Sequence, residues 1–203
     1  MALWRVIWLM SATLIAAGLG LATSPFAASD AAKVLEDMEA AKPGWLPDLG
    51  ICPVDAMPAR ETLLDYSRER CAADLEQCVR HCQAGNANDC YVSALILQEV
   101  RHSPISDAFF LRACTLGIVS GCINRAAGMD SGQGGDCAIH TYDMGCDGSD
   151  PWACTMLGFH LARGIGIAKD TERARRALSK SCRYGGTDQA CGFGRALLHE
   201  IGE

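Results

Sequence analysis

Basic residues and aromatic residues are both scarce in this 203-residue sequence. The chain carries 18 Lys and Arg against 24 Asp and Glu, a formal net charge of -6. Because this balance repels a phosphate backbone unless a compact basic face exists, we expect no nucleic-acid partner. Aromatic residues make up only 6% of the chain, although hydrophobic residues reach 49%. The core is therefore expected to consist of small aliphatic side chains at close helix contacts, which favours an all-α fold.

Motifs for common hydrolytic chemistry are also missing from the sequence. It contains neither the Ser-x-x-Lys of penicillin-recognising enzymes nor the Gly-x-Ser-x-Gly elbow of other serine hydrolases. Its histidines form no His-Glu-x-x-His zinc motif. They are scattered along the chain, at His81, His102, His140, His160 and His199. We therefore predict no catalytic residue, no cofactor and no metal, and we favour a non-catalytic protein over an enzyme.

The N-terminus has the pattern of a secretory signal peptide, which we assign to residues 1–28. Arg5 gives a positive start, an apolar run extends from Val6 to Ala17, and small residues follow through Ala28. An uncleaved anchor is the alternative, since an apolar stretch of about 17 residues is at the lower limit for spanning a bilayer. We expect a periplasmic or secreted protein that meets a membrane only through this segment, if it is retained.

Proline divides the rest of the chain into two parts. Segment 29–59 contains Pro43, Pro47, Pro53 and Pro58, and because proline interrupts helices it is predicted to be an extended lead-in. In segment 60–203 proline almost disappears and the apolar positions follow helical spacing. This segment is predicted to be the helical domain.

The twelve cysteines reveal an internal repeat. Four of them follow one another after 32, 32 and 36 residues, and each has a second cysteine eight or nine residues later. Such a pair in one helix would be about 12 Å apart along the axis, too far for a disulfide, so the chain must bend between its members. A glycine follows the first cysteine in each pair, at Gly85, Gly117, Gly148 and Gly185, where a helix could end. We predict disulfides between successive repeats, at Cys82–Cys90, Cys114–Cys122, Cys146–Cys154 and Cys182–Cys191.

The stretch between Cys154 and Cys182 shows the repeating unit most clearly. Asp150-Pro151 is a typical helix start, Gly164-Ile165-Gly166 a typical break, and Asp170 a typical cap for a second helix. The same frame predicts a helix over 88–100 with a partner starting at Ser103-Pro104, a poorer pair through Ile123 and Cys137, and an unpaired last helix over 188–201. The predicted fold is an α-solenoid of antiparallel helix pairs that ends in a half-repeat.

Four cysteines lie outside the repeated pairs. A single helix is predicted from Arg60 to Gln83, in which Cys71 and Cys78 would be too far apart to bond each other. Cys78 falls on a core register, Cys52 could fold back to either of these two, and Cys137 is expected to be unpaired or buried. A metal or redox site built from Cys78, His81 and Cys82 is a further alternative.

A basic stripe lies on the second helix predicted between Cys154 and Cys182. It is predicted to be a solvated helix face rather than a docking site for an acidic partner. Its members are Arg173, Arg176, Lys180 and Arg183.

Several of these motifs resemble one known family. Ala153-Cys154-Thr155-Met156-Leu157-Gly158, followed by Gly164-Ile165-Gly166-Ile167 and Lys180-Ser181-Cys182, is similar to a Sel-one-like repeat of the cysteine-rich bacterial secreted branch. The resemblance extends from Cys71 to the C-terminus. The sequence departs from the family pattern in two places. Arg101-His102-Ser103 replaces the Gly-x-Gly turn in the first unit, and Arg195 replaces a helix glycine in the last.

This resemblance implies a right-handed superhelix whose concave side binds a protein or peptide. It also implies two alternatives, because some cysteine-rich members are described as β-lactamase-like or as binding cell-wall fragments, and a mitochondrial member assists cytochrome oxidase assembly. Our leading hypothesis is an exported, non-catalytic scaffold with a protein or peptide partner. A β-lactamase-like or cell-wall-processing protein is the first alternative, and a thiol-redox or metal assembly factor is the second.

Overall fold

The computed structural model describes residues 25–62, 64, 67–130 and 135–202. The predicted signal peptide lies almost wholly outside them. Within these ranges every regular element is a helix, as expected for an all-α fold. The helices are α2 (Pro25–Ala41), the short 3-10 helix η1 (Pro53–Ala56), α3 (Arg68–Ala73), α4 (Leu75–Gln83), α5 (Ala87–Val100), α6 (Pro104–Thr115), α7 (Val119–Asp130), α8 (Gly135–Asp147), α9 (Pro151–Arg163), α10 (Thr171–Lys180) and α11 (Gln189–Glu200).

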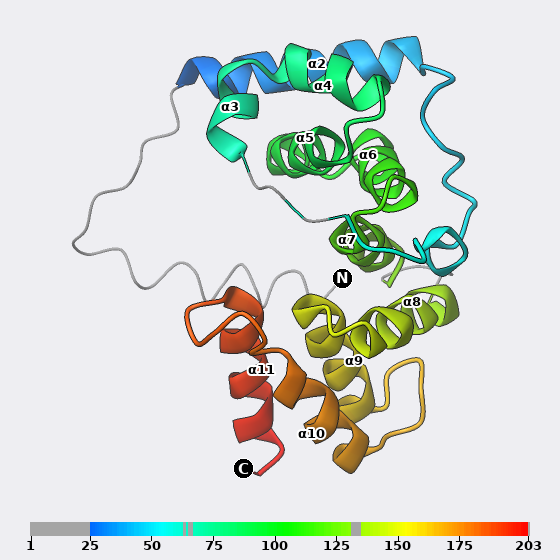
Figure 1. Ribbon diagram of the computed structural model, residues 1–203, viewed down its shortest axis with the longest axis vertical. Helices are drawn as coiled ribbons and strands as arrows, with labels where there is room; N and C mark the ends of the chain where they lie inside the picture. The colour runs from blue at the N-terminus through cyan, green and yellow to red at the C-terminus, as the bar shows by residue number, and fades with distance from the viewer. Residues whose placement is uncertain (1–24, 63, 65–66, 131–134, 203) are drawn as a thin grey trace, which may run out of the picture.

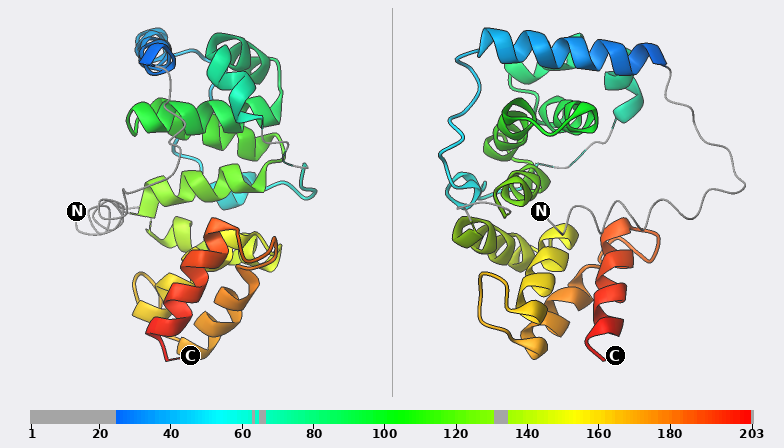
Figure 2. Two further views of the ribbon diagram at one scale, coloured as in Figure 1. Left: turned by 90° about the vertical axis from the view of Figure 1, so that its left-hand side faces the viewer. Right: turned by 180° about the vertical axis from the view of Figure 1, so that it is seen from behind.

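From α4 to α10 each helix packs against the next one in the chain, so that the helices form a stack (Figure 1). At the C-terminal end α11 packs against α9 and α10, and at the other end α2 lies across α4 and α5. Figure 2 shows these two ends of the stack from behind and from the side. One buried apolar cluster extends from α2 to α6 and a second lies among α7 to α10. The core is thus distributed along the stack.

Helix starts and stops follow the sequence pattern closely. Asp150 and Asp170 cap α9 and α10 by accepting hydrogen bonds from the backbone N–H groups of Ala153 and Arg173. Ser103 caps α6 and forms a capping box with Ser106. Pro104 and Pro151 occupy the first turns of these helices, where the missing N–H does no harm. The helices predicted around Asn88, Pro104, Pro151 and Asp188 are therefore confirmed.

The predicted turns between paired cysteines are confirmed, with one exception. Gly85, Gly117 and Gly185 have φ of 99°, 114° and 101°, a left-handed conformation that glycine adopts without strain. In the third pair the left-handed residue is Ser149, at φ 64°, and not Gly148. Ser149 stands three residues after Cys146, as the glycines do after their cysteines. The backbone thus keeps the repeat register where the residue type departs from it.

Two expectations about the N-terminal part are wrong. Segment 29–59 is not extended throughout, because its first part belongs to α2, where Ala31, Val34 and Leu35 lie at helical spacing and are buried in the first cluster. The single helix expected from Arg60 to Gln83 is absent from the described residues. Instead α3 and α4 are separated at Asp74, whose φ of -148° is not helical and whose carboxylate accepts a hydrogen bond from Gln77 N.

Within the described ranges, no helix is both long and apolar enough to span a membrane.

Candidate functional site

The four predicted disulfides between successive repeats are present, and we call them the repeat disulfides. Their Cα–Cα distances lie between 4.3 and 4.7 Å. Each one spans the turn between the last helix of one pair and the first helix of the next. All twelve cysteines are bonded, in six disulfides. Six disulfides in a chain of this size indicate an oxidising environment, such as the periplasm or the extracellular space.

The other two disulfides correct our expectations. Cys71 bonds Cys78 with a Cα–Cα distance of 5.5 Å, because the break at Asp74 removes the helical separation that would have kept them apart. Cys137 is not unpaired. It bonds Cys52, which therefore does not fold back to α3 or α4, and their Cα atoms are 5.8 Å apart. This bond fixes η1 and the lead-in on the side of α6, α7 and α8.

A buried aspartate lies beside the Cys71–Cys78 disulfide. Asp89 is fully buried in the first turn of α5, immediately before Cys90. The corresponding residue is Gly121, Ala153 or Ala190 in the other three units, so a charge replaces a small side chain here. This departure is visible in the sequence, and it is the signal that our sequence analysis missed. A buried charge is stable only when it is paired and hydrogen-bonded.

Two basic side chains surround the carboxylate of Asp89. Arg70 donates to both of its oxygens, with Nη1 3.2 Å from Oδ2 and Nη2 bonded to Oδ1. His81 Nδ1 lies 2.8 Å from Oδ2. The side chains of Arg70 and His81 are 44% and 46% exposed, whereas that of Asp89 is 1% exposed. The carboxylate is thus held between the protein interior and two partly solvated cations or hydrogen-bond donors.

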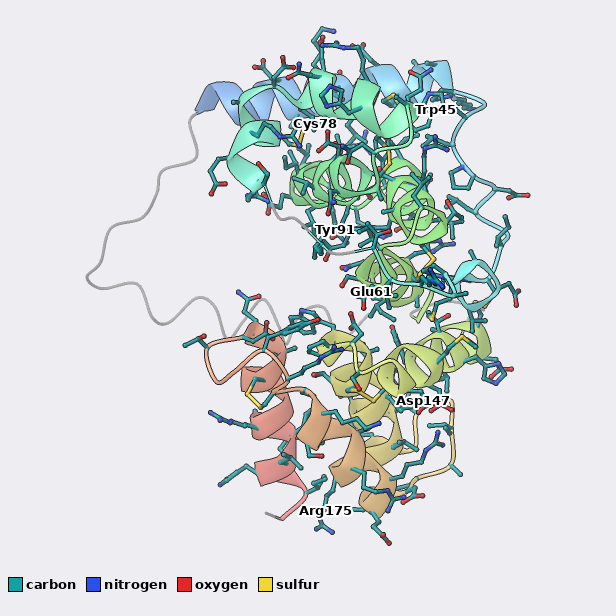
Figure 3. All side chains as sticks on the ribbon, viewed as in Figure 1. Trp45, Glu61, Cys78, Tyr91, Asp147 and Arg175 are labelled. Carbon is teal, nitrogen blue, oxygen red and sulfur yellow. A yellow bond between two sulfur atoms is a disulfide. The ribbon has the colours of Figure 1, made fainter. Side chains whose placement is uncertain are left out.

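The sulfur atoms complete what we call the Asp89 cluster, which consists of Arg70, Cys71, Cys78, His81 and Asp89. Arg70 Nη1 lies 3.2 Å from Cys78 Sγ, and Cys71 Sγ lies 3.9 Å from Asp89 Oδ1. Figure 3 shows Cys78 where α4 faces α5. Both sulfur atoms and a carboxylate oxygen of Asp89 lie within 4.8 Å of one another. That grouping could hold a metal ion only after the disulfide is reduced, because a disulfide offers no thiolate ligand.

The metal site of Cys78, His81 and Cys82 that we considered from the sequence is not assembled in the oxidised protein. Of its three members, Cys78 is bonded to Cys71 and Cys82 to Cys90, which leaves His81 beside Asp89.

The basic stripe lies near the surface and makes contacts within the chain. Arg173 pairs with Asp143, Arg176 pairs with Glu172, and Arg183 donates to backbone carbonyls.

A cleft of about 610 Å³ lies between α2, α3, the start of α4 and the end of α5. Its apolar lining residues are Ala31, Val34, Ala72, Ala73, Leu75, Ile96 and Val100, and its charged lining residues are Asp30, Lys33, Arg68, Asp74, Glu76 and Glu99. Residues 72–75 lie inside the loop that the Cys71–Cys78 disulfide closes. The loop that this disulfide closes therefore forms part of the cleft wall, whereas the Asp89 cluster itself is not among the described lining residues.

Comparisons with protein-family models, with curated proteins and with solved structures gave no match to this chain.

Proposed function

We propose that this protein is an exported, disulfide-braced helical-repeat scaffold that binds a segment of a protein or peptide in the cleft between α2 and α3–α5. The observation that carries the proposal is the composition of the cleft, which has apolar walls and a predominantly acidic rim. Peptide-binding helical arrays use such clefts to bury a few apolar side chains while charges at the rim set the orientation.

The charges around the cleft define the chemistry of the partner. Four of the lining residues are acidic and two are basic. Both bases are already in ion pairs, Lys33 with Asp37 and Arg68 with Glu99. Glu76 is 67% exposed and only loosely paired with Arg80, at 3.8 Å. The field at the cleft is therefore negative, and it favours a segment in which Lys or Arg flanks apolar residues.

The cleft lining does not favour the β-lactamase-like alternative. Among the described residues that line the cleft there is no serine, threonine, cysteine or histidine. Acylation chemistry on a β-lactam needs an activated nucleophile within reach of its substrate. The lining supports binding, and the repeat disulfides support a pre-organised shape that loses little conformational entropy when a partner binds.

Selection from a random peptide library on the oxidised protein tests this proposal. The affinities of the selected peptides would be measured by fluorescence anisotropy. We expect peptides that combine apolar and basic residues, and we expect their affinity to fall with added salt. Val100→Lys in the cleft should weaken binding at least about tenfold, because it places a charge against apolar side chains of the peptide and reduces the negative charge that attracts its basic residues.

Met144→Lys is the matched control, because Met144 is also an exposed apolar residue but lies on α8, away from the cleft. It should leave the affinity unchanged. If the selected peptides bind the two variants equally well, or if acidic peptides are selected, the cleft is not the binding site that we propose.

A further inference from the structure

The Cys71–Cys78 disulfide has no part in joining the repeats. The repeat disulfides connect successive helix pairs, and Cys52–Cys137 connects the lead-in to α8. Cys71–Cys78 instead joins α3 to α4, two short helices of 6 and 9 residues at the edge of the array. The repeats can therefore stay linked when this bond opens.

The two sulfur atoms have different electrostatic surroundings. Cys78 Sγ lies 3.2 Å from the guanidinium of Arg70, a group that stays protonated at every physiological pH. A neighbouring cation stabilises a thiolate. Cys71 Sγ instead faces the carboxylate of Asp89 at 3.9 Å, which disfavours a thiolate but can accept the proton of a thiol. The reduced pair would therefore consist of a thiolate at Cys78 and a thiol at Cys71.

The position of Asp89 adds a second, independent observation. Glycine or alanine fills the equivalent place in the other units, so the repeat can be built without a charge there. Burying a carboxylate in place of a small residue carries a desolvation penalty. Pairing with Arg70 and His81 compensates for this penalty but is not expected to make the fold more stable than a small residue would. The charge is placed beside the one disulfide that joins neither successive helix pairs nor the lead-in to α8.

We propose that Cys71–Cys78 is a thiol–disulfide exchange site that acts on cysteine-containing polypeptides. In the reduced form the Cys78 thiolate attacks one sulfur of a partner's disulfide. A bond forms between Cys78 and that sulfur, and the other partner sulfur leaves as a thiolate. Asp89 takes the proton from Cys71, and the Cys71 thiolate then attacks Cys78 Sγ. The Cys71–Cys78 bond forms and the first partner sulfur leaves, so two electrons pass from this dithiol to the partner.

The same steps in reverse oxidise a partner dithiol and leave Cys71 and Cys78 reduced. Both sulfur atoms are buried, so exchange requires the loop over residues 72–77 to move. Ala72, Ala73 and Asp74 in this loop are exposed and line the cleft. Leu75 is the one buried side chain between residues 72 and 77, so local opening of this loop breaks few buried contacts. A polypeptide held in the cleft would lie against the loop over residues 72–77. The reactivity of the two thiols does not depend on that binding.

Two single-thiol variants test the asymmetry. Cys71→Ser leaves Cys78 as the one free thiol, and Cys78→Ser leaves Cys71, with the other five disulfides verified by mass spectrometry. The rate of alkylation by iodoacetamide would be followed against pH. Near neutral pH we expect the Cys71→Ser protein to react at least about tenfold faster than the Cys78→Ser protein. The midpoint of its rate against pH should lie below that of an ordinary cysteine. Adding Arg70→Gln to Cys71→Ser should remove most of this difference.

Because both thiols are buried under the same loop, limited access slows both variants and cannot create the difference. Equal rates, or a faster reaction at Cys71, would overturn the proposal. Loss of peptide binding in the cleft would not, so the two proposals fail separately.

The wild-type chain gives a measurement that needs no variant. Brief treatment with dithiothreitol, trapping with N-ethylmaleimide and peptide mapping would identify the disulfide that is reduced first. We expect Cys71 and Cys78 to be labelled before Cys52–Cys137 and Cys182–Cys191, although three of the cysteines in those bonds, Cys52, Cys137 and Cys182, are partly exposed. If either of those bonds is reduced first, Cys71–Cys78 is a structural disulfide and the proposal is wrong.

Discussion

Arg125 and Asp107 form an ion pair in which both side chains are nearly buried, 8% and 10% exposed, with Nη1 3.6 Å from Oδ2. His102 Nε2 lies 3.2 Å from the other oxygen of the carboxylate. Arg125 also donates from Nη2 to the carbonyl oxygen of Leu49 at 3.0 Å. The pair therefore connects α6 and α7 with the lead-in, and the loss of one partner would leave a buried charge without its counter-ion.

Arg125→Met should accordingly reduce the free energy of unfolding by about 3–5 kcal/mol, measured by guanidinium denaturation of the oxidised protein. The double variant Arg125→Met/Asp107→Asn removes the stranded carboxylate as well. It should recover a large part of this loss. If the single and double variants are equally unstable, the main role of Arg125 is its hydrogen bond to Leu49 and not charge compensation.

The disulfides should differ in their contribution according to the loop that each one closes. Cys52–Cys137 joins residues 85 apart in the sequence, whereas Cys146–Cys154 joins residues 8 apart. In the chain-entropy model the long loop contributes about 4–5 kcal/mol and the short one about 2–3 kcal/mol. We therefore expect the double serine variant of Cys52 and Cys137 to be the less stable of the two in guanidinium denaturation. The opposite order would indicate that the short repeat disulfides maintain the angle between helix pairs enthalpically.

The repeat disulfides could be predicted because the information lies within each turn. The spacing of Cys82 and Cys90 forbids a continuous helix, and Gly85 supplies the left-handed residue that the bend needs. Capping residues such as Asp150 and Asp170 fixed the helix starts in the same local way. Where the residue type changed, at Ser149, the prediction chose the wrong residue because it followed glycine and not the register.

The Asp89 cluster and the cleft could not be predicted, because they depend on tertiary contacts. Nothing near Cys52 in the sequence identifies Cys137 as its partner. The break at Asp74 was missed since a single N-cap residue does not interrupt the helical pattern around it. Helix α2 was missed because its apolar stripe becomes stable only by packing on α4 and α5.

The close approach of α9 and α10 gives a third prediction. A Cβ atom built on Gly158 would lie 2.5 Å from Cγ and from Cδ2 of Leu178, which is fully buried. Gly158→Ala should therefore destabilise the protein by about 1–3 kcal/mol through overpacking, although alanine favours helix. Gly192→Ala in α11 is the matched control, since nothing lies within 4 Å of its Cβ position. It should raise the stability by roughly 0.5–1 kcal/mol. Thermal or guanidinium unfolding of both variants distinguishes packing from helix propensity, and similar effects in the two would argue against the close contact.

The N-cap of α9 is the basis for a prediction about pH. Burial raises the pKa of the Asp150 carboxyl above its ordinary value, although hydrogen bonds from Ala153 N at 2.9 Å and from Ser120 Oγ at 3.1 Å, together with the charge of Arg183, act in the opposite direction. A carboxyl whose pKa is higher in the folded state than in the unfolded state stabilises the fold most when it is protonated. That contribution is present below the unfolded pKa and is lost as the pH rises through the folded pKa.

Asp150→Asn keeps an oxygen that can accept the hydrogen bond from Ala153 N but carries no charge. Its free energy of unfolding should therefore increase relative to that of the wild type as the pH rises from the acidic range to neutral, because only the wild-type chain must then bury an ionised carboxylate. Asp150→Ala loses the cap itself and should cost about 1 kcal/mol in comparison with Asp150→Asn at every pH. Guanidinium unfolding of the three proteins across this range measures both differences. If the stability of Asp150→Asn relative to wild type falls with rising pH, the hydrogen bonds and Arg183 outweigh burial, and the ionised carboxylate stabilises the start of α9.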